Sequence, residues 1–293
     1  MLLFGCSATA GRPPFDGDKA FELLKKQVDF GPRYSGSAGH PKTADFLFTE
    51  LKKYSPAVIE QKFMHNVDGK PLEFRNIIAT FNEKAPERVL LCAHWDSRPM
   101  ADQEIDKEKR KQPILGANDG ASGVAVLLEL ARLFAAKAPD VGVVIVLFDG
   151  EDYGETPDRM FIGSEEFAKN WKTLTGGKDF KYGILLDMIG DSNLKIYREG
   201  FSNNAARAVV DKVWNAAKDR GYSDYFVDES KYTVSDDHIP LLQAHIKCID
   251  VIDFNYAPWH TLDDTVDKCS PKSLQIVGNV ISDVVYNERS AVK

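Results

Sequence analysis

Acidic and histidine side chains stand at or just beyond the ends of four apolar runs, and these side chains could bind a metal ion and transfer protons. Carboxylates and imidazoles that gather in one place repel one another and resist leaving water unless a cation holds them. Their repetition therefore predicts a metalloenzyme. The runs span residues 89–96, 143–152, 182–191 and 247–254, and the segment 259–264 (WHTLDD) closely follows the last of them.

The four runs must be the elements that position these side chains. Continuous Val, Ile and Leu residues are typical of strands buried on both faces of a mostly parallel sheet. In such sheets, ligands bind in the crevice beyond the carboxyl ends of the strands. We therefore expect the polar side chains to meet along one edge of the sheet.

Helical spacing alternates with these strands along the chain. Residues 58–65 and 72–81 alternate as strands do, and DGK (68–70) between them predicts a hairpin. The alternation of strands and helices favours a three-layer α/β/α sandwich, whose mixed, mostly parallel sheet has antiparallel strands at one side. Ser270 and Pro271 predict the start of the last helix. Helices are predicted over residues 18–29, 43–54, 124–136, 164–171, 203–220 and 271–286.

The chain is long enough to bury a large core, with 293 residues of which 43% are hydrophobic. Its length allows one or two domains, but no repeat, low-complexity tract or long Gly/Ser linker divides the sequence. We predict one α/β catalytic domain over residues 18–293, after an N-terminal tail over residues 1–17. The long polar stretch 97–115 is the kind of loop that is often functional.

The overall charge argues against a nucleic-acid partner. The formal net charge is −7, whereas proteins that bind nucleic acids favour a basic face. The basic run KEKRK (107–111) is short and flanked by acids, which is typical of a solvated loop. No apolar stretch in the sequence is long enough to span a membrane.

The first residues, MLLFGCSATAG, indicate export. A small residue stands before Cys6 after Leu and Phe, which resembles the end of a bacterial lipoprotein signal, although the positive part and most of the apolar part of a signal peptide are missing. We therefore expect an exported protein, periplasmic or lipid-anchored through Cys6 on the outer side of the membrane. A plain tail with a free thiol is the alternative.

The four cysteines, Cys6, Cys92, Cys248 and Cys269, have no CxxC spacing. Neither a thiol nucleophile nor a cysteine zinc site is therefore predicted. Cys92 and Cys248 fall within predicted strands, where cysteine acts as a small buried apolar residue. A disulfide between two of the four stays open.

Each polar cluster also has an ordinary structural interpretation. His94 and Asp96 are two residues apart in an extended segment, so both side chains point the same way. Asp119 lies in a glycine-rich turn before a helix, where an aspartate often serves only as a cap. Glu151 and Asp152 are adjacent at a strand edge with opposed side chains. One of them can bind a metal while the other stays free as a base, or both are solvated loop acids.

Two further residues complete the set. Asp187 lies within an apolar strand, where an unpaired aspartate almost never occurs. His260 follows Trp259 and could be a core histidine with satisfied hydrogen bonds. Each polar residue could have an ordinary structural role on its own. Chance is not expected to give all of them only such roles when they stand at successive strand ends. The set favours a functional site.

Six motifs in a fixed order resemble the M28-type zinc aminopeptidase superfamily. They are HWDS (94–97), GANDGASG (116–123), DGED (149–152), LLDMIG (185–190), SDDHIPLL (235–242) and WHTLDD (259–264). Within this superfamily the chain is most similar to glutaminyl-peptide cyclotransferases, or glutaminyl cyclases, especially bacterial forms close to the animal type. The resemblance extends from residue 31 to the last helix. The cyclase assignment depends on fewer residues, namely DDHIP (236–240) and the tryptophan directly before His260.

The resemblance implies a role for each matching position. Asp119, Asp152 and His260 match the zinc ligands, and three protein ligands leave the open position that a catalytic zinc needs. Glu151 matches the general acid and base. Trp259 matches a wall of a narrow substrate pocket.

Other positions match supporting residues. Asp187 and Asp236 match carboxylates that assist proton transfer near the substrate. His94 and Asp187 also match positions that hold a second zinc in the two-metal aminopeptidases, so one or two zinc ions stay open. Asp96 is expected to orient His94 or the nearby backbone.

The resemblance implies zinc-dependent cyclisation of the N-terminal glutamine of peptides or proteins to pyroglutamate, with release of ammonia. This reaction belongs to the aminoacyltransferase class, and one zinc ion is expected for it. The alternative is an M28-type aminopeptidase that hydrolyses N-terminal residues with two zinc ions. A binding protein that kept the fold without activity is a third interpretation, which the complete set of acids and ligands disfavours.

The sequence departs from the animal cyclases in three places. Asp152 stands where they have glutamate. They carry a tryptophan shortly after this acid pair, but residues 153–160 contain none, and Met160 or Phe161 is expected to replace that pocket wall. Their disulfide beside the first histidine motif is not matched by Cys92. The loop 97–115 and the segment 153–162 are predicted to form the pocket rim.

Overall fold

The computed structural model describes residues 12–156 and 159–290. Within these residues, a central sheet has the strand order β1-β2-β4-β3-β5-β8, and two short strands, β6 and β7, pair outside it. The strands are β1 (Ala57–Val67), β2 (Lys70–Phe81), β3 (Arg88–His94), β4 (Gly142–Phe148), β5 (Phe180–Asp187), β6 (Ile196–Arg198), β7 (Phe226–Ser230) and β8 (Cys248–Ile252).

The central sheet is mixed, and this part of the sequence prediction is confirmed. β1 and β2 form an antiparallel hairpin, and β2 pairs antiparallel with β4. Strands β4, β3, β5 and β8 run parallel to one another. Residues 68 and 69 have positive φ at the hairpin turn, as a two-residue turn between strands requires. His94 lies opposite Phe148, and Asp187 lies opposite Ile252, so the carboxyl ends of the parallel strands reach the same edge.

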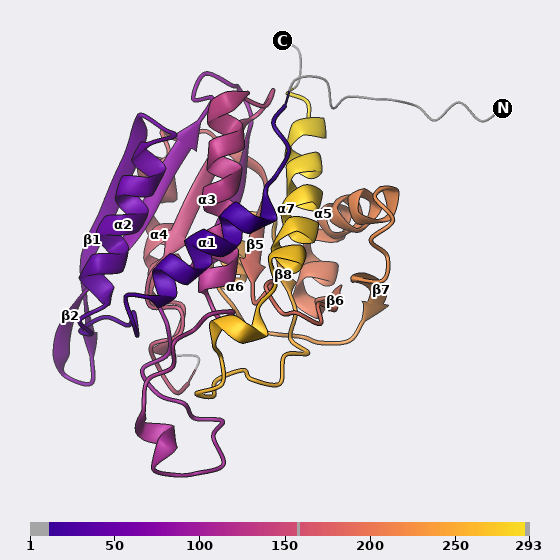
Figure 1. The fold of residues 1–293 in the computed structure, drawn as a ribbon. Helices are drawn as coiled ribbons and strands as arrows, with labels where there is room; N and C mark the ends of the chain where they lie inside the picture. The colour runs from indigo at the N-terminus through magenta and orange to yellow at the C-terminus, as the bar shows by residue number, and fades with distance from the viewer. Residues whose placement is uncertain (1–11, 157–158, 291–293) are drawn as a thin grey trace.

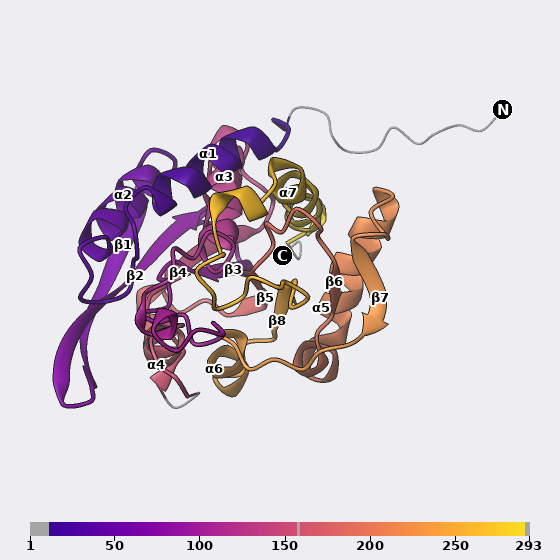
Figure 2. The ribbon, with the colours of Figure 1, turned by 60° about the horizontal axis from the view of Figure 1, so that its bottom comes forward.

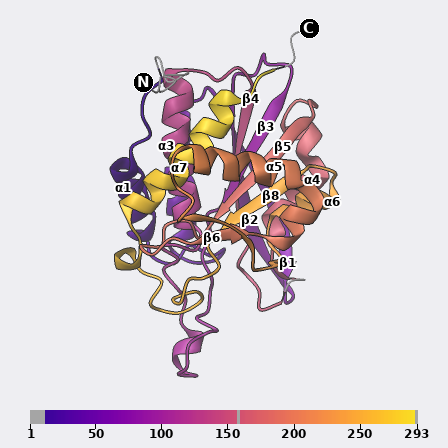
Figure 3. The same ribbon diagram turned by 90° about the vertical axis from the view of Figure 1, so that its right-hand side faces the viewer.

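Helices cover both faces of the sheet and give the three layers (Figures 1 and 3). Helices α2, α3, α5 and α7 pack in a large apolar cluster on one face, with α1 lying over α3 and α7. Helices α4 and α6 cover the other face, where they pack against one another. The helices are α1 (Gly17–Val28), α2 (His40–Lys52), α3 (Ala121–Ala136), α4 (Ile162–Leu174), α5 (Gly200–Asp219), α6 (His238–Gln243) and α7 (Pro271–Asn287).

The sequence predicts most of these elements within a few residues. The Ser270 side chain caps α7 by accepting from the Lys272 N–H, as expected. β6, β7 and α6 have no counterpart among the predicted elements. Each of them has six residues or fewer, which is too short for apolar periodicity to distinguish from a loop.

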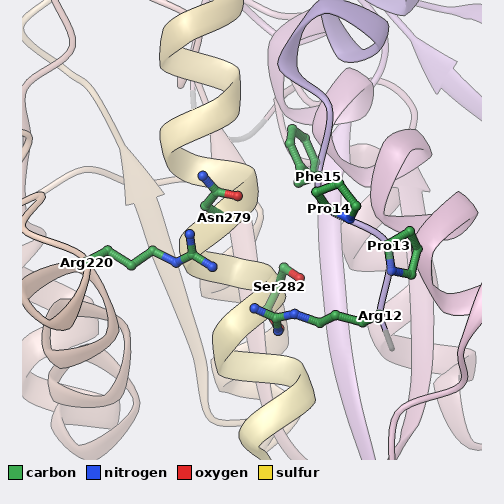
Figure 4. A pocket seen from close by; sticks show the side chains of 7 residues that line it. All are labelled: Arg12, Pro13, Pro14, Phe15, Arg220, Asn279 and Ser282. Atoms are coloured by element: carbon green, nitrogen blue, oxygen red, sulfur yellow. The ribbon is translucent and has the colours of Figure 1, made fainter. Parts of the chain in front are cut away.

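The segment before α1 packs along the last helix. Phe15 is buried, and a Cβ on Gly278 would lie 2.3 Å from the Phe15 ring. Arg12 and Arg220 approach α7 from two sides and line a pocket there (Figure 4). Both arginines form ion pairs with Asp283. These contacts tie the N-terminal end of the described chain to α7.

The structure also bears on the cysteines, the basic run and membrane-spanning helices. Cys92, Cys248 and Cys269 are free and buried, while Cys6 lies outside the described residues. Every residue of the run 107–111 is exposed, as expected for a solvated loop. Among the described helices, none combines the length and apolarity needed to cross a membrane.

Candidate active site

The long segments that follow β3 and β8 lie over the carboxyl edge of the sheet (Figure 2). Hydrogen bonds join these two segments to one another. The Gln103 N–H donates to the His260 carbonyl at 3.2 Å, and the Leu262 N–H donates to Glu104 Oε1 at 3.1 Å. The loop 97–115 contains a short 3-10 helix at Lys109–Lys111 but is otherwise irregular.

Asp119, Asp152 and His260 meet at this edge. One ligand atom from each lies within 4.8 Å of the others, and all three residues are buried. His260 Nε2 is 3.3 Å from Asp152 Oδ1 and 3.6 Å from Asp119 Oδ2. The sequence predicts these three residues as zinc ligands, and the fold brings them together from three separate segments.

The turn before α3 allows Asp119 to approach the strand ends. A Cβ on Gly120 would lie 2.5 Å from His94, and a Cβ on Gly123 would lie 2.1 Å from the Leu186 carbonyl oxygen. Side chains at these two positions would therefore push α3 away from β3 and β5. The carboxylate of Asp119 also stands next to the helix N-terminus, where the helix dipole favours negative charge.

His94 belongs to a second donor group. With Asp119 and Asp187 it forms another buried set whose ligand atoms lie within 4.8 Å of one another. His94 Nε2 is 3.0 Å from Asp119 Oδ1 and 3.2 Å from Asp187 Oδ1. Burial would lower the pKa of His94, but hydrogen bonds to Asp119, Asp187 and Asp96 raise it well above its usual value. Asp119 is thus shared between the two groups.

Asp96 orients both His94 and the backbone, so the two roles considered for it are compatible. Its Oδ1 lies 3.4 Å from His94 Nδ1. The two carboxylate oxygens also accept from the N–H groups of Glu151 and Asp152, each at 3.2 Å. Asp96 therefore joins the end of β3 to the acid pair that follows β4.

Glu151 lines the pocket beside the predicted ligands without belonging to either donor group. Burial raises its pKa well above the usual value, His94 opposes this rise, and Asp152 adds to it. A carboxyl group with a raised pKa is suited to accept and return a proton near neutral pH. The pKa of Asp152 is instead lowered, because His260 and Arg98 outweigh the effect of burial.

Asp187 and Asp236 lie in the same pocket as Glu151. Asp187 is the last residue of β5, and Asp236 precedes α6. Burial, followed by the charges of Asp187 and Asp237, raises the pKa of Asp236 well above its usual value. One oxygen of Asp236 accepts the Asp237 N–H, and the other has no hydrogen-bond partner among the described residues.

Apolar side chains form part of the pocket wall. Trp259 stacks on the His260 ring with centroids 3.9 Å apart, and Phe254 meets Trp259 edge-on at 5.0 Å. Of the two residues expected to replace the pocket tryptophan of the animal cyclases, Met160 lines the pocket, whereas Phe161 is buried at the start of α4. The remaining apolar lining consists of Met188, Val234 and Ile252.

Three residues near the predicted ligands are missing from the sequence prediction. Arg98 forms an ion pair with Asp152, and Asp102 lies 3.1 Å from His260 Nδ1. Asp264 holds the turn before α3. Asp264 belongs to the WHTLDD motif and could have been noted from it, but Arg98 and Asp102 carry no signal beyond their place in a polar loop.

We expect Asp264→Asn to lower the free energy of unfolding by about 1–3 kcal/mol, because a buried N–H would lose its acceptor. The Asp264 carboxylate accepts from the Asn118 N–H at 2.8 Å, the Asp119 N–H at 3.2 Å and the Tyr256 hydroxyl at 2.8 Å. An amide can replace only one of its two oxygens as an acceptor. Urea unfolding measures the effect, with the exposed Asp263→Asn as the matched control. Equal stability of the two variants would contradict the assigned role.

The donor set fits a zinc ion at Asp119, Asp152 and His260. Among the described residues, five acids line the pocket, and no lysine or arginine joins them. Asp152 Oδ2 is buried and has no hydrogen-bond partner among the described residues. Unpartnered buried carboxylate oxygens are costly unless a cation meets them, and two carboxylates with one imidazole are ligands that zinc accepts.

Comparisons with known proteins identify the family of the chain. The model of Peptidase family M28 matches residues 76–285. The chain is 25% identical to the glutaminyl-peptide cyclotransferase of Drosophila melanogaster over 276 residues, which cover 84% of this chain and 75% of that protein.

Solved structures are more similar still. A glutaminyl cyclase of Bacteroides thetaiotaomicron bound to N-acetylhistamine shares 39% identity and a TM-score of 0.91, covering 95% of this chain and all of that one. A structure described as a leucine aminopeptidase precursor from the same species shares 38% identity and a TM-score of 0.91, covering 94% of this chain and 99% of that one. Because the family model spans most of the chain, the protein belongs to peptidase family M28.

Proposed function

We propose that the protein is a glutaminyl-peptide cyclotransferase, which converts the N-terminal glutamine of a peptide to pyroglutamate and releases ammonia. The observation that carries the proposal is Glu151, a buried acid in a narrow pocket beside the donors Asp119, Asp152 and His260. The similarity to cyclotransferases along most of the chain supports the same reaction.

The reaction forms a bond between the α-amine and the side-chain carbonyl carbon of glutamine and breaks the bond from that carbon to the amide nitrogen. Zinc held by the three donors, one ion in this proposal, would supply Lewis acidity toward the side-chain carbonyl. The pocket walls hold the amine against the carbonyl. Such orientation contributes roughly 7–11 kcal/mol to lowering the barrier in well-oriented intramolecular reactions.

Glu151 moves the proton in this proposal. It accepts a proton from the attacking α-amine and then donates it to the departing nitrogen, which leaves as ammonia. Asp187 and Asp236 line the same pocket, and burial together with the charges of Asp187 and Asp237 raises the pKa of Asp236. These two acids hold the amine and exchange protons with Glu151.

Hydrolysis of the first peptide bond is the second candidate. The observation that favours it is the second donor group, His94, Asp119 and Asp187, which could hold another zinc ion. Glu151 would then activate a water molecule instead of an amine. The curated relatives give this candidate less support, because the glutaminyl-peptide cyclotransferases of Drosophila melanogaster and Bos taurus match 84% and 85% of the chain, whereas a probable zinc metalloprotease of Leptosphaeria maculans matches 45%.

Two peptides that differ only in the first residue test the proposal. The zinc-loaded protein is incubated with a peptide that begins with glutamine and with the same peptide beginning with alanine. We expect ammonia from the first peptide and no reaction with the second. Release of free alanine or glutamine would contradict the proposal and favour the aminopeptidase.

Trp259→Leu is expected to raise KM for the glutamine peptide roughly tenfold, which corresponds to about 1.4 kcal/mol. The indole forms an apolar wall of the pocket and stacks on His260. Steady-state kinetics and zinc analysis measure the effect, and zinc content should stay unchanged. Trp214→Leu is the matched control, because Trp214 is buried between α5 and β7. An equal KM in both variants would remove Trp259 from the substrate pocket.

We propose export on the N-terminal sequence alone. The finer expectation of a lipid anchor has no support from the relatives, and Cys6 lies outside the described residues. Fractionation of cells with an antibody against the protein tests export. Mass spectrometry of native material tests the anchor, which an unmodified Cys6 would exclude.

A further inference from the structure

The loop after β3 reaches the outer side of the predicted zinc ligands. Arg98 is almost fully buried, and its guanidinium forms an ion pair with Asp152 Oδ1. The Nε atom of the same guanidinium donates to Asp102 Oδ1 at 2.5 Å. Asp102 Oδ1 in turn lies 3.1 Å from His260 Nδ1. Arg98 and Asp102 therefore link two predicted ligands from outside the set.

The contact of Asp102 with His260 decides which ring nitrogen is available to a metal. His260 Nε2 faces Asp152 and Asp119, at 3.3 Å and 3.6 Å. Nδ1 has no regular hydrogen bond among the described residues. The Asp102 carboxylate, 3.1 Å away, is placed to accept a hydrogen bond from a proton on Nδ1. A proton held on Nδ1 leaves the Nε2 lone pair free for zinc.

The same loop also holds the backbone of His260. His260 has a φ of 55°, a left-handed conformation that costs free energy for a residue with a side chain and needs support from its surroundings. The Gln103 N–H donates to the His260 carbonyl, and Glu104 accepts the Leu262 N–H. Asp102 thus contacts the His260 ring, Gln103 the His260 carbonyl and Glu104 the turn at Leu262.

Arg98 forms ion pairs with both Asp152 and Asp102. It engages Oδ1 of Asp152 and leaves Oδ2 buried and without a hydrogen-bond partner among the described residues. It also holds Asp102, whose side chain is 30% exposed, against the histidine. Without Arg98, Asp102 would lose its buried partner and keep its contacts with the exposed Gln103 side chain and with His260.

We propose that Asp102, held by Arg98, is a positioning residue that fixes the orientation and tautomer of His260 for zinc binding. The inference rests on the proposed zinc site and deepens it. Carboxylates in this position behind a ligand histidine typically contribute about 10- to 100-fold to metal affinity or activity.

Zinc affinity of the full-length protein tests the inference directly. The dissociation constant is measured by competition with a chromophoric chelator for the wild type, Asp102→Asn and Asp102→Ala. We expect zinc binding to weaken about 10- to 100-fold in Asp102→Ala and to a smaller extent in Asp102→Asn, which keeps an acceptor oxygen. Asp106→Asn is the matched control, because Asp106 is an exposed acid in the same loop.

Two further readouts separate positioning from a merely structural role. Thermal unfolding of the zinc-free proteins should be alike in all variants, and the visible spectrum of the Co²⁺-substituted Asp102→Asn protein should shift relative to the control. Zinc affinity within twofold of the wild type in both Asp102 variants would overturn the inference. A loss of zinc-free stability with unchanged zinc affinity would also overturn it. Because neither readout uses turnover, failure of the cyclase assignment leaves this test valid.

Discussion

Glu151→Gln is expected to lower kcat by roughly 10²–10⁴-fold while the protein keeps its zinc, because positioned proton transfer contributes about that factor. The substitution keeps the shape of the side chain and removes its ability to accept a proton. Glu151 lies outside both donor groups, so zinc content should not fall. Turnover is followed by ammonia release, and zinc by elemental analysis of the same preparation.

Glu155→Gln is the matched control for this variant. Glu155 is exposed and lies four residues further along the same segment, so the same chemical change there should leave kcat unaltered. Near-normal turnover by zinc-loaded Glu151→Gln would remove Glu151 as the proton carrier. Loss of zinc from this variant would instead make Glu151 a ligand.

His260→Ala is expected to abolish cyclisation through loss of zinc. The ring supplies the only nitrogen donor in the set with Asp119 and Asp152, and removal of it leaves two acids that cannot hold the ion alone in the same geometry. Asp119→Ala and Asp152→Ala should weaken zinc binding as well. Zinc content after dialysis against a weak chelator measures the effect in each variant.

His65→Ala is the control for the histidine deletion, because His65 is exposed on β1. It should retain the zinc content and turnover of the wild type. Unchanged zinc content in all three ligand variants would refute the assigned set. Loss of only part of the zinc in Asp152→Ala or His260→Ala, with more than one ion bound to the wild type, would indicate that the second donor group is also filled, because these two residues belong to the first group alone.

Much of the fold could be predicted because its elements are long and uniformly apolar. β3 and β4 are buried at every position, so continuous Val, Ile and Leu runs identify them without any tertiary information. The hairpin of β1 and β2 follows from local turn chemistry at Asp68 and Gly69. β6 and β7 could not be predicted, because they are short strands whose pairing depends on distant parts of the chain.

The site could be predicted where residues follow strand ends. His94, Asp187 and the acid pair after β4 are all placed by the register of parallel strands, and a resemblance of motifs supplied the ligand roles of Asp119, Asp152 and His260. Arg98 and Asp102 belong to an irregular loop, where no periodicity fixes the direction of a side chain. Their contacts with Asp152 and His260 depend on how two loops meet in space, which the sequence alone does not specify.

The most direct measurement follows a glutamine-initiated peptide by mass spectrometry with the zinc-loaded protein and with the chelator-treated protein. The proposed reaction removes one ammonia from the peptide, keeps its length, and stops when zinc is withdrawn. Free glutamine with a shortened peptide would contradict the account and show hydrolysis. Loss of ammonia at an undiminished rate in the presence of the chelator would contradict the role of zinc.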